Sequence, residues 1–217
     1  MDIVVEALKI RDSLTDYEEN HIDTNLAPVL PFKGNDRIKL IVIGQDPTIT
    51  EVKERGKIKT TLKLDAPGPL RRYIESICRG LEITIENVYA TNLFKYFYKK
   101  KPASTPKVLA AHLESNLALL KKELSEYSDC IIITLGQPVL QLLTDKKHFV
   151  KDYWGYKNGE FHYLEPDENK LELKVYPFAH LPSIIAHALL FIVTTLICIS
   201  NILRGSTIAP KANDTIN

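Results

Sequence analysis

The stretch Lys39-Leu40-Ile41-Val42-Ile43-Gly44-Gln45-Asp46-Pro47-Thr48 decides the fold of this chain. Its apolar run, residues 40–43, predicts a strand buried on both faces in a parallel sheet. Gly44 lets the backbone turn without a Cβ clash, and Pro47 ends the ladder of hydrogen bonds. Asp46 therefore follows the carboxyl end of a central strand, the edge where open α/β sheets bind ligands. A carboxylate there is either a solvated turn residue, which is the commoner case, or a catalytic base.

The composition excludes several classes of protein. With 217 residues the chain is one large domain or two small ones, and it can bury a substantial core. Its net charge is +1, so any contact with nucleic acid must come from a local basic patch. Cys78, Cys130 and Cys198 stand far apart without a CxxC pair, which argues against zinc, an iron–sulfur cluster or a disulfide scaffold. We expect buried free thiols in a cytoplasmic protein, and the acidic first residues do not resemble a signal peptide.

Polar residues also follow two other predicted strands. The β-branched and aromatic run Val88-Tyr89-Ala90 ends in Thr91-Asn92. Asn92 offers both a donor and an acceptor, so it can read an amide-like edge, and an Asn turn is the alternative. Residues 171–176 form another predicted strand, with His180 just beyond it. A lone His is more often incidental, but three polar residues at three strand ends point to one site.

Predicted helices alternate with these strands. A further apolar strand is expected over residues 130–136 and a short helix over 137–143. Other helices are expected over residues 1–20, over residues 70–81 and from Ser104-Thr105-Pro106 onward. Residues 21–37 indicate a loop, residues 60–64 an extended segment, and Asn158-Gly159 a hairpin turn. The alternation predicts an α/β sandwich with right-handed crossovers.

A basic and aromatic segment follows the strand that ends at Asn92. It reads Lys95-Tyr96-Phe97-Tyr98-Lys99-Lys100-Lys101. Lysines interleaved with aromatic rings suit phosphate contact combined with base stacking. A solvated run of charges is the common alternative.

Four motifs together resemble the uracil-DNA glycosylase superfamily. Each motif is weak alone, but they stand in the family's order and cover residues 38–183. They are Gly44-Gln45-Asp46-Pro47, Thr91-Asn92-Leu93-Phe94-Lys95, Leu135-Gly136-Gln137-Pro138-Val139-Leu140 and His180-Leu181-Pro182-Ser183. The first looks like the water-activating motif, and the last resembles a second motif that is usually His-Pro-Ser. Lys95 and the Leu-Gly turn are similar to the iron–sulfur branch of the superfamily.

The resemblance implies a fold and an activity. The fold is a three-layer α/β/α sandwich around a mainly parallel four-stranded sheet, with one domain over residues 1–204 and a disordered tail over 205–217. The activity is hydrolysis of the N-glycosidic bond of uracil, or of a related deaminated or damaged base, in base excision repair of DNA. The target base must leave the duplex stack before the enzyme can reach it.

The resemblance also implies residue roles. Asp46 orients a water and stabilises the oxocarbenium-like sugar, and His180 donates a hydrogen bond to charge that develops on uracil O2. Asn92 reads the uracil edge and rejects cytosine. The full base-binding set is Gly44, Gln45, Thr48 and Asn92, and the DNA-binding set is Lys99, Lys100, Lys101, Pro182, Ser183 and Ile184. We expect a monomer that acts on a flipped-out base in single- or double-stranded DNA, with no metal and no cofactor.

The chain departs from the family pattern at three places. The family has Tyr, which blocks the thymine methyl, where this chain has Thr48. The family's stacking Phe aligns near Leu62, and Leu181 intervenes between His180 and Pro182. The missing Tyr and Phe motivate an alternative, a non-catalytic nucleic-acid-binding member of the same fold.

The carboxyl-terminal region is unusually apolar. Residues 181–203 contain no charged side chain, and the run reaches transmembrane length. It is a buried helix that covers one sheet face, a membrane tail, or a tail foreign to the family. We expect the buried helix, because this fold needs a final helix on its sheet.

Overall fold

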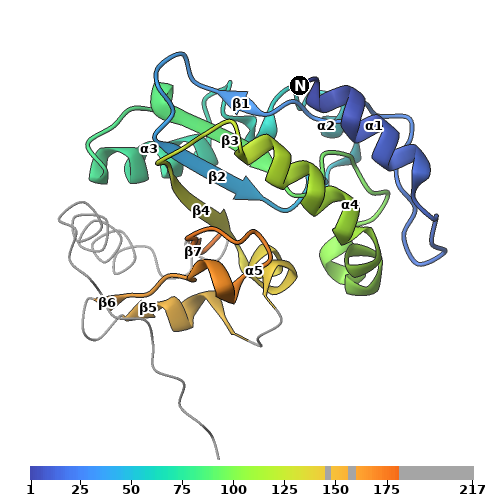
Figure 1. Cartoon of the computed structure of the whole chain (residues 1–217). Coiled ribbons are helices and arrows are strands. Elements are labelled where there is room, and N and C mark those ends of the chain that lie inside the picture. The colour runs from blue at the N-terminus through green and yellow to red at the C-terminus, as the bar shows by residue number, and fades with distance from the viewer. Residues whose placement is uncertain (145–147, 156–159, 181–217) are drawn as a thin grey trace, which may run out of the picture.

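The computed structural model describes residues 1–144, 148–155 and 160–180, and its centre is a five-stranded sheet (Figure 1). The strand order is β1-β3-β2-β4-β7. The sheet consists of β1 (Phe32–Lys33), β2 (Leu40–Gly44), β3 (Val88–Asn92), β4 (Ile131–Leu135) and β7 (Tyr176–Phe178). All residues of β2 are buried, as the apolar run predicts for a strand covered on both faces.

The predicted parallel strands are present, and one further strand joins them. β2 pairs in parallel with β3 and β4, and β4 pairs in parallel with β7. The fifth strand, β1, runs antiparallel to β3 at the edge of the sheet. The predicted count of four strands was therefore one too low. β1 is only two residues long and lies in a stretch whose Pro and Gly residues indicated a loop.

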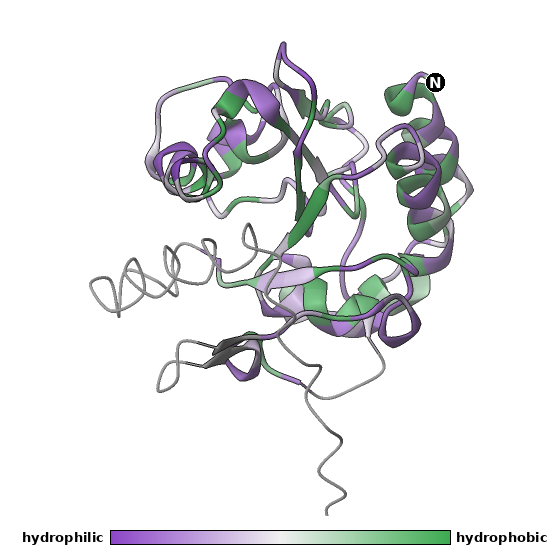
Figure 2. Ribbon diagram, turned by 60° about the vertical axis from the view of Figure 1, so that its left-hand side comes forward, coloured by the Kyte–Doolittle hydropathy of each residue, from purple (hydrophilic) through white to green (hydrophobic). Residues whose placement is uncertain are grey.

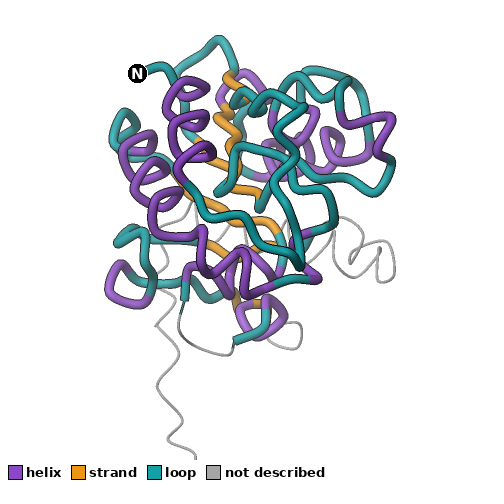
Figure 3. Tube along the Cα trace, turned by 90° about the vertical axis from the view of Figure 1, so that its right-hand side faces the viewer, coloured by secondary structure: helices purple, strands orange, loops and turns teal. Residues whose placement is uncertain are grey.

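Helices cover both faces of the sheet. α3 (Pro69–Gly80) lies on one face, and α4 (Pro106–Leu124) lies on the other with α1 (Ile3–Ser13) packed against it (Figure 2). α5 (Gln137–Leu143) packs beside α4 and β4, and the short α2 (Val52–Arg55) follows β2. The strands lie between the two helical layers (Figure 3). This is the predicted three-layer α/β sandwich.

The helix starts follow their local signals. Asp2 caps α1 by accepting hydrogen bonds from the backbone amides of Val4 and Val5. α4 begins at Pro106, where the hydroxyl–Pro signal predicted it, but the Thr105 hydroxyl donates to the carbonyl of Pro102 instead of capping the helix. Residues 137–143 form a helix as predicted.

One predicted extended segment is wrong, and one predicted strand starts later than expected. Residues 61–63 form a 3-10 turn instead, with Leu62 at φ 60° and Lys63 at φ 52°. The strand expected over residues 171–176 begins only at Tyr176. The buried side chain of Asn169 accepts from the Leu171 amide and donates to the carbonyl of Leu173. That Asx-type turn competes with the strand.

The remaining elements are short. 3-10 turns span Ile85–Asn87, Pro102–Ser104, Val150–Tyr153 and Pro166–Glu168, and β5 (Trp154–Gly155) pairs antiparallel with β6 (Glu160–Phe161). This pair flanks the predicted hairpin turn Asn158-Gly159, which lies outside the described residues. Cys198, the apolar run over 181–203 and the predicted domain end at residue 204 also lie outside the described residues. Within the described ranges, no helix has both the length and the apolar character of a membrane span.

Candidate active site

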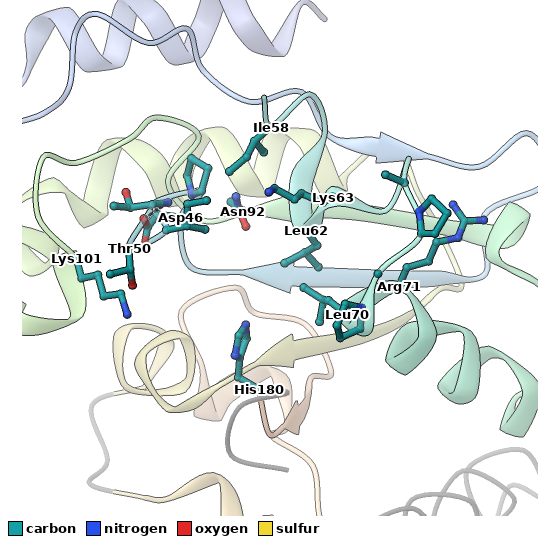
Figure 4. A pocket seen from close by; sticks show the side chains of 17 residues that line it. Asp46, Thr50, Ile58, Leu62, Lys63, Leu70, Arg71, Asn92, Lys101 and His180 are labelled. Atoms are coloured by element: carbon teal, nitrogen blue, oxygen red, sulfur yellow. Dashed lines mark hydrogen bonds between the residues drawn. The ribbon is translucent and has the colours of Figure 1, made fainter. Parts of the chain in front are cut away.

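The ends of three strands bring Asp46, Asn92 and His180 to one pocket of about 580 Å³ (Figure 4). Asp46 lies two residues beyond β2, Asn92 is the last residue of β3, and His180 lies two residues beyond β7. β2 and β4 are neighbours at the centre of the sheet. From β2 the chain continues to β3 on one side of this pair, and from β4 it continues to β7 on the other side. This reversal opens a crevice at the carboxyl ends of the strands, where ligands bind in open α/β sheets. The sequence had placed these three side chains at one edge, and the structure brings them together.

The Asp46 carboxylate is held in a fixed orientation. One oxygen accepts from the Thr48 backbone amide at 2.7 Å, and the other accepts from the Gln45 side-chain amide at 2.9 Å. Burial raises the pKa of Asp46 from 3.8 to about 6, although the contacts from Thr48 and Gln45 and the charge of Arg55 oppose that rise. Asp46 is thus ionised at neutral pH and becomes protonated in mildly acidic solution.

The other predicted base-binding residues surround this carboxylate. Thr48 lines the pocket, and its hydroxyl accepts from the Tyr98 backbone amide at 2.9 Å. The side-chain amide of Gln45 donates to Asp46, and the backbone carbonyl of Gln45 accepts from the backbone amide of Phe94. The turn after β2 is therefore tied to the segment after β3 at two points.

Asn92 lines the pocket and carries a buried acceptor without a hydrogen-bond partner among the described residues. This acceptor is the side-chain Oδ1, and Asn92 is 2 % exposed. Gly44 lies opposite Asn92 in the parallel pair, and a Cβ on Gly44 would stand 2.4 Å from that Oδ1. The glycine therefore leaves the space that the Asn92 side chain fills. A buried acceptor without a donor costs free energy, so a ligand with an N–H group is favoured here.

His180 lies on the opposite side of the pocket from Asp46 and Asn92 (Figure 4). Part of its ring faces the open pocket, yet the surrounding protein excludes enough water to lower its pKa. The imidazole is then neutral at pH 7 and has one N–H to donate. Gly136, at φ 90°, lets β4 turn into α5 close by, where an added Cβ would stand 3.2 Å from the Cβ of His180.

The basic segment after Asn92 differs from its predicted role in part. Tyr96, Phe97 and Tyr98 are buried in the core, so these rings do not stack on a base. Lys95 is 1 % exposed and forms an ion pair inside the protein. Base stacking by this segment is therefore excluded.

The lysines at the end of the segment remain available. Lys99, Lys100 and Lys101 are exposed, and Lys101 lines the pocket. The side chain of Asn20 holds their backbone, because it accepts from the Lys100 amide and donates to the Lys100 carbonyl.

The wall of the pocket away from Lys101 contains residues that sequence reasoning did not select. Lys63 and Arg71 lie there, together with Leu62 and Leu70 (Figure 4). Leu62 is the residue that aligned with the family's stacking Phe, and it does line the pocket. The sequence contains little indication of this wall. Its position depends on the left-handed backbone of Leu62 and Lys63, and no local sequence pattern predicts that conformation.

Arg55 is a further residue that the sequence did not single out. It is 3 % exposed, and its guanidinium donates to the carbonyls of Ile49, Tyr98 and Lys99. It therefore joins the loop that carries Asp46 to the segment that carries the exposed lysines. The sequence showed only a polar loop here, because burial of one Arg depends on distant carbonyls.

Replacing Arg55 by Met is expected to lower the free energy of unfolding by about 1–3 kcal/mol, since it leaves buried carbonyls without donors. The midpoint of urea unfolding measures this loss. Lys57→Met is the matched control, because its ion pair with Glu54 is exposed and stabilises little. Equal midpoints for Arg55→Met and the wild type would contradict the structural role of Arg55.

Three of the predicted DNA-binding residues, Pro182, Ser183 and Ile184, lie outside the described residues. Among the residues that are described, no group of three or more His, Cys, Asp or Glu side chains is arranged to hold a metal ion. Cys78 is a buried free thiol and Cys130 a partly buried one.

The fold and the pocket define an α/β domain with a ligand site at the carboxyl edge of its parallel sheet. Residues 31–191 match the family model of the Uracil DNA glycosylase superfamily. The match covers most of the chain and contains Asp46, Asn92 and His180, so the chain belongs to this superfamily. No curated protein matches the chain.

Proposed function

We propose that this protein removes uracil from DNA by hydrolysing the N-glycosidic bond, as an enzyme of base excision repair. The observation that carries the proposal is the buried, unpartnered Oδ1 of Asn92 in the same pocket as the Asp46 carboxylate. A glycosylase needs a group that selects the base and a group that activates water, and these two side chains supply both.

Asn92 would select uracil by its hydrogen-bonding pattern. The Oδ1 accepts the N3–H of uracil, and the side-chain amide donates to uracil O4. Cytosine has no hydrogen on N3 and carries an amino group at position 4, so both contacts would be reversed. Buried polar groups left unpaired in this way reject the wrong base strongly.

Asp46 and His180 would act on the two sides of the breaking bond. The N1–C1′ bond breaks and its electron pair stays on uracil, which leaves as an anion. Asp46 stabilises the positive charge on the sugar, orients the water that adds to C1′ and takes up a proton from that water. Neutral His180 donates its N–H to uracil O2, where negative charge develops.

Basic side chains would hold the DNA around the flipped-out nucleotide. Lys101 lines one end of the pocket, and Lys63 and Arg71 line the wall away from it (Figure 4). Lys99 and Lys100 are exposed next to Lys101. Because the net charge is only +1, this local arrangement supplies the attraction for phosphates.

Bases larger than uracil would also be accepted if position 48 faces C5 of the base. The side chain there is a Thr whose hydroxyl is held by the Tyr98 amide, so position 48 itself carries no ring against a substituent on C5. We therefore include 5-substituted uracils and other deaminated bases among the substrates to be tested.

A cleavage assay tests the proposal. Oligonucleotides carry one uracil, a thymine mismatch, hypoxanthine or 5-hydroxymethyluracil, and alkali reveals the abasic sites. We expect release of uracil by the wild type and a strongly reduced but measurable rate of release by Asn92→Ala. Binding of DNA without release of any base would overturn the proposal and favour the non-catalytic alternative.

The pH dependence gives a separate prediction. Asp46 must be ionised to act, and its pKa is raised to about 6, so kcat/KM should fall as the pH is lowered through about 6. An unperturbed Asp would keep its activity to lower pH, because its pKa is 3.8. Single-turnover rates on the uracil oligonucleotide between about pH 4 and pH 8 measure this limb. A flat profile down to the usual range of Asp would contradict the assigned role.

A further inference from the structure

We propose that the buried ion pair of Lys95 and Glu123 is a positioning device for Asn92, and that selection and release of the base depend on it. The inference rests on the proposed function. Neither residue touches the pocket, so both act through Asn92 and not on the base.

The ammonium group of Lys95 uses all its donors within the protein. It donates to the Thr91 hydroxyl at 2.6 Å, to the Asn92 backbone carbonyl at 2.5 Å and to the Glu123 carboxylate at 2.6 Å. The other oxygen of Glu123 accepts from the Tyr89 hydroxyl at 2.5 Å. The network therefore contacts β3 at three residues, the last of which is Asn92 itself.

The Asn92 peptide is consequently held from both directions. On one side, the Leu93 amide donates to the Gly44 carbonyl and extends the pairing of β3 with β2. On the other, the Asn92 carbonyl accepts a charge-assisted hydrogen bond from Lys95, which is stronger than a neutral one. The orphan Oδ1 of Asn92 has no partner of its own, so its place depends on the backbone that carries it.

Stability alone does not explain this pair. Both side chains are 1 % exposed, and a buried ion pair is often no more stabilising than apolar residues of the same volume. A recognition group has to be held within about 0.5 Å of its productive position. We infer that the ion pair is kept for this purpose.

The test removes both charges at once, so that neither is left buried and unpaired. Lys95→Met/Glu123→Gln should keep the thermal midpoint near that of the wild type, because Met fills the place of the Lys stem. We expect kcat for uracil release to fall by about 10–100-fold, by analogy with residues that orient the ligands of metal sites. KM should change little, since phosphate contacts dominate DNA affinity.

A double-mutant cycle with Asn92→Ala separates positioning from general damage. If the pair acts through Asn92, removing it from the Asn92→Ala protein should cause no further loss. The matched control is Lys121→Met/Glu172→Gln, which removes a partly exposed ion pair that also starts from α4. That control should keep the wild-type kcat.

Three outcomes would overturn the inference. They are wild-type kcat in the charge-free variant, an equal loss in the Asn92→Ala background, and an equal loss in the control. If the charge-free variant does not fold, Thr91→Val removes one acceptor of Lys95 without unpairing a charge, and an unchanged kcat would then count against it.

A measurement independent of catalysis distinguishes failure of this inference from failure of the proposed function. If the wild type releases no base, the proposed function is wrong. The side-chain amide signals of Asn92 in nitrogen-15 NMR spectra then report its position directly. We expect them to shift or broaden in the charge-free variant but not in the control, and unchanged signals would reject the positioning role.

Discussion

Asp46→Asn is expected to lower the rate of uracil release by about 10²–10⁴-fold, the contribution typical of a positioned acid–base group. Asn has the shape of Asp, and its Oδ1 still accepts from the Thr48 amide. It carries no charge to stabilise the sugar cation and takes no proton from water. Single-turnover release from a uracil oligonucleotide measures the loss.

The same variant should be more stable than the wild type at neutral pH. Because the pKa of Asp46 is raised in the folded protein, folding favours its protonated form. That stabilisation is present below about pH 4 and is lost as the pH rises through about 6. Asn removes the ionisation, so the gain in the free energy of unfolding should be about 3 kcal/mol near pH 8 and close to zero near pH 4.

Asp36→Asn is the matched control for both measurements. Asp36 is exposed in the loop before β2 and is absent from the pocket lining. Its replacement should leave the release rate and the pH dependence of stability as they are in the wild type. An active Asp46→Asn protein would remove Asp46 from the mechanism, whatever its effect on stability.

Gly44→Ala is expected to abolish most of the activity while the sheet still forms. The added Cβ would stand 2.4 Å from Asn92 Oδ1 and 3.1 Å from Leu62 Cδ2, so one of these side chains must move. Overpacking of this kind typically costs about 1–3 kcal/mol of stability. The displaced group is the proposed base-reading amide, so kcat/KM should fall further than the stability loss alone explains.

Gly56→Ala is the control for this change. Gly56 has helical backbone angles, and its nearest neighbour to an added Cβ is Leu26 Cδ2 at 3.9 Å. Activity and thermal midpoint should both stay near the wild-type values. If Gly44→Ala keeps full kcat/KM in the same assay, Asn92 is not the group that reads the base.

Much of the fold was predictable because it depends on local pattern. The apolar runs before Gly44, Asn92 and Gly136 each gave a buried strand, and α5 covers the residues predicted for it. Parallel strands deliver their carboxyl ends to one edge, so the meeting of Asp46, Asn92 and His180 also followed from sequence. The late start of β7 has a local cause, because the Asn169 side chain binds the backbone of Leu171 and Leu173 and competes with the strand.

Lys95 shows why the functional interpretation of a segment is harder. In the sequence it begins a run of lysines and aromatic rings that suits nucleic acid. In the folded protein it points inward to Glu123, 28 residues further along the chain, and the rings beside it fill the core. A charged side chain is buried only where an oppositely charged partner lies close to it in the fold. Neighbouring residues in the sequence do not identify that partner.

The sequence by itself determined the strand–helix alternation, the edge of the sheet that forms the site and the three side chains gathered there. These features follow from short-range periodicity and from the chirality of parallel crossovers. Only the tertiary structure decided which polar atoms are left without partners, which carboxylate has a raised pKa and which lysine is buried. Those properties depend on desolvation and on contacts between distant segments, because every neighbour within a few ångströms contributes to them.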